Sequence, residues 1–520
     1  MTGVRVVTEP LGGSPLSRLL QQGDAPAAWL TPRPASAEEW RARARARVAE
    51  GDWADRWAAL LPALEPTGDA AARLSRVQRH GGVVVTTGQQ PGLFGGPLYT
   101  WSKAMSALAL ADELEARTGI PTAAVFWAAT DDADFAEAAS TVVARSGGLD
   151  VLRAMQAPAP GTPMALAPLG ELREADRRLR DASGSAADAR VLDATTNAYG
   201  LPERSHGDAF VRLLRVLLAP LGMPVLDASH PAVRAASAPA IHEAMARAGD
   251  IESALAARAG EIRAAGFEPQ VDDIPGLALA FAYDGVVKRR LTIAEAGSRR
   301  DGLTPNVLLR PIVERAILPT VAYVAGPGEL AYFAQVTAVS DVLGVPAPVA
   351  VPRWSCTLVE PHVQTLLDRV GVTPQDLVDP DALEGRLARA SMRDGTARAM
   401  SELREAIALL PDALGDESEE LRMGPAVVGA SQSLQHRVDR LERRLVAAIK
   451  RRETGQMRDV ATLRAALRPR GSRQERVLNA IPLIARHGSE LLSELYRAAG
   501  PHARQLVEPG STPQPEGGER

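Results

Sequence analysis

Three short polar segments of this sequence carry side-chain types that could bind or transform a small molecule. The first follows a β-branched run and reads TTGQQPGLFGGPLYTWSK, beginning at Thr86. Its backbone N–H groups and carboxamides suit a phosphate, a carboxylate or a sugar hydroxyl. It lacks the Gly-Lys-Ser/Thr of a Walker A loop and the spacing of GxGxxG. The alternative is a structural turn in which glycines supply positive φ angles. We favour ligand binding, through Thr87, Gly88, Gln89, Gln90, Gly95, Gly96 and Tyr99, because adjacent carboxamides are unusual in a bare turn.

The second segment, FWAATDDADF, places three carboxylates within four residues, shortly after Trp127. Asp131, Asp132 and Asp134 could bind Mg²⁺, orient a substrate amine or supply a general base. The alternative is an exposed acidic loop in which an aspartate caps a helix. The aromatic pair before the loop indicates that it opens from a buried strand.

The third segment, GPGELAYFAQ, has a tight loop at Gly326 and Gly328 followed by a helix. Glu329, Tyr332 and Gln335 are spaced i, i+3 and i+6, which permits all three to share one helical face. We expect that face to point into a ligand crevice. A glutamate at this position could instead only cap the helix dipole.

Other candidate residues stand alone. Lys103 could reach a phosphate from the start of the first helix, and Arg310 and Arg353 could hold a carboxylate with two hydrogen bonds. The eight histidines are scattered without metal-ligand spacing, so we expect no metal site from them. The single cysteine, Cys356, is predicted to be a packed side chain.

The three polar segments follow predicted strands of one parallel sheet. Strand, helix and strand over residues 81–129 form a βαβ unit, and further strands are expected within 221–231, 320–325 and 347–353. Continuous apolar runs are typical of parallel strands that are buried on both faces. Because ligands bind beyond the carboxyl ends of such strands, the three segments should meet at one crevice.

The rest of the chain is predicted to be mainly helical. Residues 1–80 look helical, and 277–293 read as a β-hairpin with Asp284-Gly285 at its turn. Leu434, Val438, Leu441 and Leu445 have the 4-3-4 spacing of a coiled-coil seam. We therefore divide the chain into four parts: an α/β core with insertions at about 151–220 and 232–300, a helical coiled-coil domain, a segment that packs back on the core and a disordered tail. Their bounds are 1–360, 361–465, 466–505 and 506–520.

Charge and composition narrow the class of protein. The 520 residues carry 59 Lys and Arg against 63 Asp and Glu, a net charge of −4. This balance argues against a nucleic-acid or anionic-membrane partner. One cysteine and no recognisable signal peptide or long apolar span are typical of a cytoplasmic protein.

The sequence blocks together resemble the BshC family of bacillithiol biosynthesis. The resemblance rests on TTGQQPGLFGGPLYTWSKAMSALALA, FWAATDDADFAEA, PNVLLRPIVERAILPTVAYVAGPGELAYFAQ, VPRWSCTLVE and GSRQERVLNAIPLIARHG, in this order. It covers residues 81 to about 490. The patterns TGQQ-x-GL-x-x-GPLYT and GPGE-x-AY are long and therefore specific.

This resemblance implies a fold and a reaction. The fold would be a Rossmann-like α/β core, related to nucleotidyltransferases, with helical insertions and an α-helical coiled coil that forms a homodimer. The reaction would be that of a ligase, which joins L-cysteine by an amide bond to the amine of glucosaminyl-malate. ATP or another nucleotide is the expected activator of the cysteine carboxyl, with or without Mg²⁺.

The resemblance also implies roles for residues. Gly88, Gln89 and Gln90 would form one wall of the site, and Glu329 with Tyr332 the opposite side. Asp132 and Asp134 would supply catalytic carboxylates together with Glu329, and Arg310 would bind the malate carboxylates. A nucleotide near the coiled coil would meet Arg473, Gln474, Glu475 and Arg476.

One departure from the family pattern affects the predicted chemistry. The family usually has Glu-Asp-His-Asp-Phe after its tryptophan strand, whereas this chain has Asp131-Asp132-Ala133-Asp134-Phe135. The missing histidine is the side chain that exchanges protons most readily near neutral pH. This leaves two alternatives open beside the cysteine ligase: a related ligase acting on a different amine and acid, and a non-catalytic partner assembled through the coiled coil.

Overall fold

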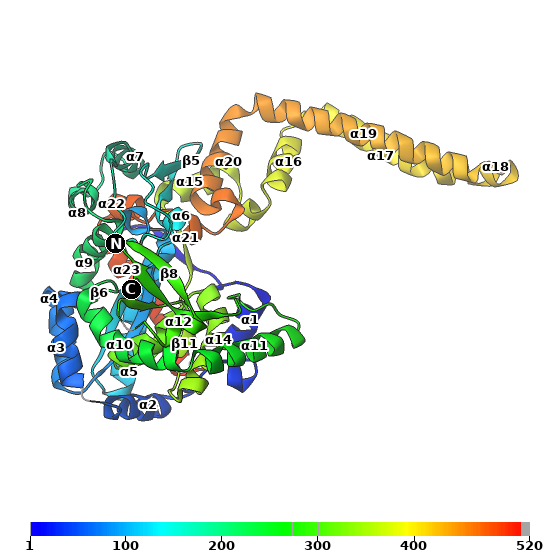
Figure 1. Ribbon diagram of the computed structural model, residues 1–520. Coiled ribbons are helices and arrows are strands. Elements are labelled where there is room, and N and C mark those ends of the chain that lie inside the picture. The colour runs from blue at the N-terminus through cyan, green and yellow to red at the C-terminus, as the bar shows by residue number, and fades with distance from the viewer. Residues whose placement is uncertain (1, 52, 273, 300, 511–520) are drawn as a thin grey trace. The chain divides into compact units, whose positions relative to one another are not determined.

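The computed structural model describes residues 2–51, 53–272, 274–299 and 301–510 (Figure 1). These residues form two compact units. The larger unit comprises the described residues of 2–143, 150–358 and 475–510, and the smaller comprises 144–149 and 359–474. Of the tail predicted to be disordered, 506–507 end helix α23 (Glu490–Val507), and 511–520 lie outside the described residues. No helix in the described ranges is long and apolar enough to cross a membrane.

A five-stranded parallel sheet forms the centre of the larger unit. Its order is β11-β10-β2-β3-β6, with bounds Val349–Pro352, Thr320–Ala325, Val83–Gln89, Thr122–Ala128 and Val225–Asp227. Strands β3 and β10 are buried at every residue, as expected for strands covered on both faces. The register pairs Gly88 with Trp127 and Ala325 with Pro352, so the carboxyl ends of the strands share one edge. The predicted α/β class and parallel core are confirmed.

Two long helices connect the central strands. Helix α5 (Leu98–Thr118) joins β2 to β3, and α14 (Pro327–Leu343) joins β10 to β11. Each ends at a left-handed glycine, Gly119 at φ 71° and Gly344 at φ 66°, a conformation that glycine adopts without steric cost. Helix α5 is buried along most of its length because it packs on the sheet and against α23.

Further strands and helices surround this core (Figure 1). The hairpin β7 (Leu277–Asp284) and β8 (Val287–Thr292) confirms the predicted 277–293 hairpin, and β9 (Leu303–Pro305) joins it. Strands β4 (Ser140–Arg145) and β5 (Gly148–Arg153) pair together. The other helices are α1 (Pro15–Gln22), α2 (Ala37–Ala49), α3 (Trp53–Leu64), α4 (Gly68–Arg79), α6 (Phe135–Ala138), α7 (Arg173–Ser183), α8 (Ala189–Tyr199), α9 (His206–Leu218), α10 (Pro231–Ala246), α11 (Ala248–Ala264), α12 (Ile293–Ala296), α13 (Arg310–Ile317), α21 (Gln474–Val477) and α22 (Ile481–His487).

The N-terminal segment is mostly helical, as predicted for residues 1–80, but it begins with a strand that was not predicted. Residues Arg5–Thr8 form strand β1, which pairs with β12 (Cys356–Val359) in a separate two-stranded sheet. A four-residue strand whose partner lies far away in the chain has almost no local sequence signal. Cys356 itself is buried, as predicted, and burial raises the pKa of its thiol well above the usual value.

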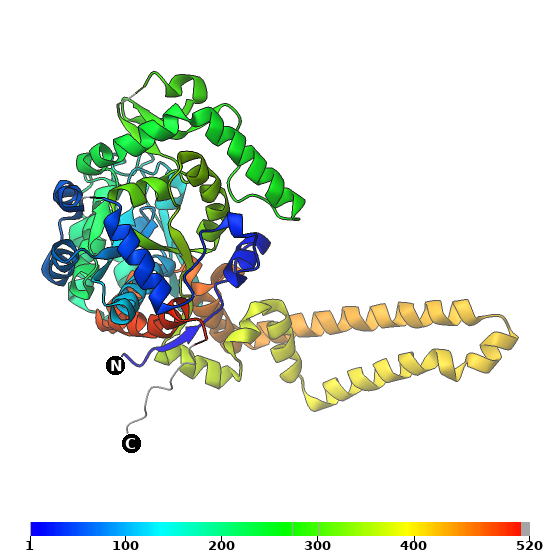
Figure 2. The same ribbon diagram turned by 90° about the horizontal axis from the view of Figure 1, so that it is seen from below.

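The smaller unit is helical and contains a long antiparallel hairpin of α17 (Asp394–Ala413) and α19 (Gly424–Arg452), drawn yellow to orange in Figure 2. Its other helices are α15 (Pro361–Val370), α16 (Pro380–Ala390), α18 (Gly415–Glu420) and α20 (Thr454–Leu467). Val438 packs with Met400 and Ile407 between the two helices, and Leu445 joins this cluster. Leu434 and Leu441 are exposed, so only half of the predicted seam lies inside the hairpin.

Candidate active site

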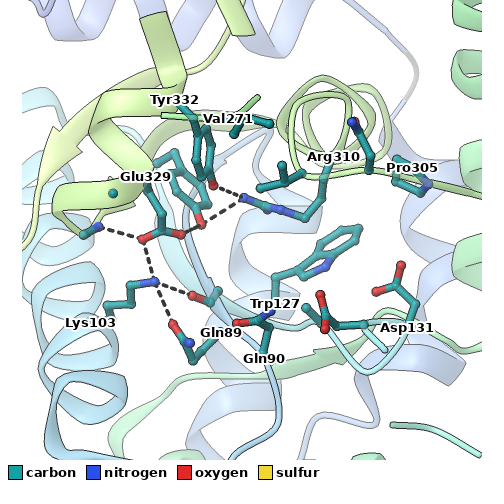
Figure 3. Close-up of a pocket in the computed structure, with 18 of the residues that line it drawn as sticks. Gln89, Gln90, Lys103, Trp127, Asp131, Val271, Pro305, Arg310, Glu329 and Tyr332 are labelled. Atoms are coloured by element: carbon teal, nitrogen blue, oxygen red, sulfur yellow. Dashed lines mark hydrogen bonds and ion pairs between the residues drawn. The ribbon is translucent and has the colours of Figure 1, made fainter. Parts of the chain in front are cut away.

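The three polar segments meet at one cavity of about 500 Å³ at the carboxyl edge of the sheet (Figure 3). Gly88, Gln89 and Gln90 line it from the end of β2, and Asp131 and Asp132 from the end of β3. The loop before α14 and the β7–β8 hairpin supply the facing walls. The convergence expected from parallel-sheet topology is therefore present in the structure.

Lys103 links the first and third segments beneath this cavity. Its Nζ donates to Gly88 O at 2.7 Å and to Gln89 Oε1 at 3.0 Å, and lies 2.5 Å from Glu329 Oε2. These three contacts are drawn in Figure 3. The side chain is only 4% exposed, and burial lowers the pKa of Lys103 while the neighbouring Glu329 opposes that shift. Lys103 therefore fixes the two loops relative to each other, a role beyond the predicted phosphate contact.

Glu329 is held in place by three donors. Besides Lys103, its Oε2 accepts from the Gly326 N–H at 2.6 Å, and its Oε1 accepts from Tyr323 Oη at 2.5 Å. Burial alone would raise the pKa of Glu329, but Lys103 and the hydrogen bonds lower it below the usual value. Glu329 is thus a buried carboxylate that both caps α14 and lines the cavity, so the capping and site interpretations are compatible.

Arg310 forms the next part of the wall. Its guanidinium donates to Tyr323 Oη at 3.0 Å and to Tyr332 Oη at 3.3 Å, and pairs with Glu314 Oε2 at 2.8 Å. Glu314 is fully buried and also accepts a hydrogen bond from Thr86. These charges and the two phenols outweigh burial and raise the pKa of Arg310 well above its usual value. Arg310 is therefore a fixed cation at the cavity wall.

Trp127 contributes a donor to the cavity. The indole is 3% exposed, yet its Nε1 has no hydrogen-bond partner among the residues that the structure describes. In Figure 3 the ring lies between Arg310 and Asp131. A buried unpaired donor is costly, so a ligand that accepts a hydrogen bond here would gain affinity.

The acidic loop divides into residues with different roles. Asp131 lies 3.3 Å from Lys288 Nζ, and that ammonium also donates to Asp131 O at 2.6 Å. Asp132 lines the cavity and accepts from the Asp134 N–H at 2.7 Å. Asp134 is exposed, accepts from the Glu137 N–H at 3.2 Å as the N-cap of α6, and is not among the residues that line the cavity. The structure thus gives Asp134 the helix-capping role that the sequence left as an alternative.

Four other predicted ligand residues also lie outside the cavity lining. Thr87 donates its hydroxyl to Val324 O at 2.9 Å within the sheet. Gly95 and Gly96 have φ angles of 79° and 73° and form the turn before α5, where Tyr199 Oη accepts from the Gly95 N–H. The side-chain amide of Gln335 donates from Nε2 to Val271 O at 2.8 Å, and its Oε1 accepts from the Val271 N–H at 3.0 Å. Gln335 does not share the cavity-facing side with Glu329 and Tyr332, because the i+6 position lies too far around the helix.

The four residues proposed for a nucleotide have separate environments. Glu475 forms a buried two-bond pair with Arg353, at 2.6 and 2.7 Å. Gln474 donates to Ala466 O at 2.8 Å, and Arg473 is half-buried. Arg476 is exposed and lines the cavity. Arg353 also lines the cavity, but its side chain is buried. The Glu475 carboxylate and the Gln474 amide thus already have protein partners, and the proposed nucleotide contact of the four residues stays a prediction.

Sequence reasoning missed the part of the site that the β7–β8 hairpin supplies. Lys288, Arg290 and Phe281 line the cavity, and the Lys288 ammonium lies 4.6 Å from the centre of the Phe281 ring. The run Lys288-Arg289-Arg290 was the available signal, since three cations in a short hairpin are costly unless anions meet them. Asn306 also lines the cavity and caps the backbone N–H groups of Leu308 and Leu309.

The histidine missing at position 133 has no replacement in the cavity lining, which contains no histidine among the described residues. His206 packs edge-on against Phe135 with ring centres 5.4 Å apart, behind the acidic loop. Burial lowers the pKa of His206 to about 4, so the ring is neutral near pH 7. The structure also has no cluster of three or more metal-ligating side chains in the described ranges.

Comparison with known sequences gives a consistent result. The chain matches the family model for the Bacillithiol biosynthesis BshC N-terminal Rossmann-like domain over residues 54–300 and 292–354. It matches the model for the BshC C-terminal coiled-coil domain over residues 356–506.

Three relatives share the name "Putative cysteine ligase BshC". The protein of Solibacter usitatus (strain Ellin6076) is 32% identical over 467 residues, which cover 85% of this chain and 87% of the relative. That of Koribacter versatilis (strain Ellin345) is 33% identical over 459 residues, which cover 83% of this chain and 84% of the relative. That of Symbiobacterium thermophilum (strain DSM 24528 / JCM 14929 / IAM 14863 / T) is 29% identical over 530 residues, which cover 90% of this chain and 93% of the relative.

Proposed function

Because the chain belongs to the BshC family of bacillithiol biosynthesis, we propose that it is a ligase that joins the carboxyl group of L-cysteine to the amine of glucosaminyl-malate. The observation that carries this proposal is the single cavity at which all three family segments meet. Its walls combine fixed cations, carboxylates and an unpaired donor, which are the groups that an amide-forming reaction between two charged substrates needs.

Asp132 is the proposed general base. The attacking amine must lose a proton as the C–N bond forms, and Asp132 is the carboxylate that lines the cavity without a cationic partner in the described residues. Asp131 is paired with Lys288, and Glu329 with Lys103, so both are better suited to positioning than to proton transfer. Asp132 thereby takes over part of the role suggested for the absent histidine.

The cationic wall would orient the acidic ends of the substrates. Arg310 and the hairpin residue Arg290 could hold the malate carboxylates, since guanidinium groups match carboxylate geometry. The Trp127 N–H would donate to a sugar hydroxyl or carbonyl. ATP or another nucleotide, with or without Mg²⁺, is the proposed co-substrate that makes the cysteine carboxyl reactive, and Arg476 in the cavity lining would meet its phosphates.

The direct test is product formation. Purified protein is incubated with L-cysteine, ATP, Mg²⁺ and glucosaminyl-malate, and the cysteinyl amide is sought by mass spectrometry, with omission of each substrate as a control. We expect the amide only in the complete mixture. No product, while an active relative forms it under the same conditions, would contradict the assigned substrates.

A related ligase for another amine and acid is the second candidate, and the Asp-Asp-Ala-Asp loop favours it. Thermal shifts against amino acids, amino-sugar conjugates and nucleotides separate the two, because a ligand that binds only the folded state raises its melting temperature. A response to other amines and none to glucosaminyl-malate would select this candidate. A non-catalytic assembly partner would instead show no response to either substrate class.

We further propose a cytoplasmic homodimer that forms through the α17–α19 hairpin. Leu403, Leu409, Leu434 and Leu441 are exposed on it, and such a set of apolar side chains is unusual on a monomer surface. Leu441→Glu should therefore shift the mass measured by light scattering from dimer to monomer. The matched substitution Arg440→Glu, on the adjacent exposed position, should leave the dimer intact.

A further inference from the structure

A second cavity, of about 210 Å³, lies at the opposite edge of the larger unit's sheet. Helix α2 lines it with Arg43 and Arg47, and the segment from α13 to β10 lines it with Arg315 and Thr320. Thr320 is the first residue of β10, whose other end leads into Gly326 of the substrate cavity. The two cavities therefore lie at the two ends of the same strand.

The arginines of this cavity outnumber their acidic partner. Glu50 is the carboxylate lining the cavity, and it pairs with both Arg47 and Arg315, at 2.5 and 2.6 Å. Arg43 feels the charges of Arg315 and Glu50, but it forms no hydrogen bond or salt bridge with a residue that the structure describes. Three guanidinium groups thus face one carboxylate in a partly desolvated space, which leaves an excess of positive charge.

Two buried polar atoms of the same cavity lack partners. The Thr320 hydroxyl belongs to a residue that is 1% exposed, and the Arg47 Nε to one that is 4% exposed. Neither has a hydrogen-bond partner within the described part of the chain. The Nη2 group of Arg47 donates hydrogen bonds to the carbonyl oxygens of Arg315 and Leu318. These bonds fix the guanidinium against the α13–β10 loop.

The electrostatics of the arginine cluster also favour a bound anion. Burial, reinforced by the charge of Arg315, lowers the pKa of Arg47 to about 9 and lowers that of Arg43. Repulsion from Arg315 adds to the effect of burial at both arginines, and Glu50 opposes it only in part. A bound anion would relieve this repulsion and would also satisfy the unpaired donors.

We propose that this cavity is a binding site for a small dianion with oxygen acceptors, held by Arg43, Arg47, Arg315 and the Thr320 hydroxyl. The site is separate from the proposed substrate cavity and does not depend on the ligase assignment. Inorganic phosphate and a compact dicarboxylate such as malate share the required chemistry, because both present paired oxygens that match the guanidinium fork. The excess of two positive charges over Glu50 matches a dianion.

The test is binding of inorganic phosphate to the full-length protein, measured by titration calorimetry at constant ionic strength, with malate in a parallel arm. Arg43→Gln is the main variant, since Arg43 makes no contact that the fold requires. Arg45→Gln, an exposed arginine two residues along the same helix, is the control with the same change of net charge. Arg476→Gln controls for binding in the substrate cavity.

We expect saturable one-to-one binding that Arg43→Gln weakens at least tenfold, in line with the loss of a charged hydrogen bond. Arg45→Gln and Arg476→Gln should change the affinity by less than about twofold, and Thr320→Val should weaken it several-fold. Binding of phosphate but not malate would identify an oxyanion site, and the reverse a dicarboxylate site. No saturable binding of either probe, or equal affinity in Arg43→Gln and Arg45→Gln, would overturn the proposal.

Discussion

Lys103 Nζ and Glu329 Oε2 lie 2.5 Å apart, although 226 residues separate them in the chain. The pair joins the helix after β2 to the helix after β10, and it also holds the Gly88 carbonyl through Lys103. Both side chains are largely buried, at 4% and 17% exposure. A largely buried ion pair therefore joins the two loops that line the cavity.

Breaking this pair from one side should be costly. Lys103→Met leaves the Glu329 carboxylate buried without its cation, and we expect the free energy of unfolding to fall by about 3–5 kcal/mol. The double variant Lys103→Met/Glu329→Gln should lose less than the sum of the two single variants, because neither charge remains. Urea denaturation measures all three. A loss below about 1 kcal/mol for Lys103→Met would contradict a buried, coupled pair.

Gly88 is required for close packing of the first loop against β3. A Cβ added at Gly88 would lie 2.8 Å from Trp127 O, closer than real contacts allow. Gly88→Ala should therefore destabilise the fold by about 1–3 kcal/mol. Gly328→Ala is the matched control, since its added Cβ would meet only the Gln270 side chain, at 3.9 Å or beyond. That variant should change stability by less than about 1 kcal/mol in thermal or chemical denaturation, and equal losses for both would contradict the steric argument.

His206 should make stability depend on pH. Its pKa is lowered from 6.5 to about 4 by burial, so the unfolded state binds more protons than the folded state between these values. Stability should therefore fall as the pH drops through this window, by about 2 kcal/mol between pH 7 and pH 5. Urea unfolding of the wild-type protein and of His206→Phe at both pH values isolates the contribution of His206 to this pH dependence. The variant should lack it, and an equal pH dependence in both proteins would contradict the assignment.

Much of the site was predictable because it follows from topology. The apolar runs at 83–89, 122–128 and 320–325 identify parallel strands, and the polar residues after each run must then share one edge of the sheet. The contribution of Lys288 was not predictable in this way. It reaches Asp131 from a hairpin 157 residues away, and no local pattern determines where such an insertion folds.

The errors within the predicted clusters have local causes. Asp134 and Gln335 are polar side chains of a type that could contact a ligand, but the backbone offers each a nearer partner. Asp134 caps the first turn of α6, and Gln335 satisfies both polar groups of Val271. Polar side chains near helix starts and loops often serve the backbone, and this competition is not visible in a residue pattern.

Arg476 and Arg473 should differ in their effect on substrate binding. Arg476 lines the cavity as an exposed cation, so Arg476→Gln should raise the KM of ATP or of glucosaminyl-malate about tenfold with little change in stability. Arg473→Gln, three residues earlier with the same change in charge, should leave both KM values within about twofold. Steady-state kinetics with each substrate varied in turn make the comparison. A larger effect at Arg473 would indicate a nucleotide site away from the cavity.

The central claim is that the cavity at the carboxyl edge of the sheet is where the amide bond forms, with Asp132 as the proton acceptor. The most direct measurement compares kcat/KM of Asp132→Asn and Asp134→Asn in the mass-spectrometric ligase assay. Both substitutions remove one charge from the same loop, and asparagine preserves the helix cap at position 134. We expect a loss of at least about 100-fold for Asp132→Asn and of less than about tenfold for Asp134→Asn. Equal losses, or a larger loss for Asp134→Asn, would contradict it.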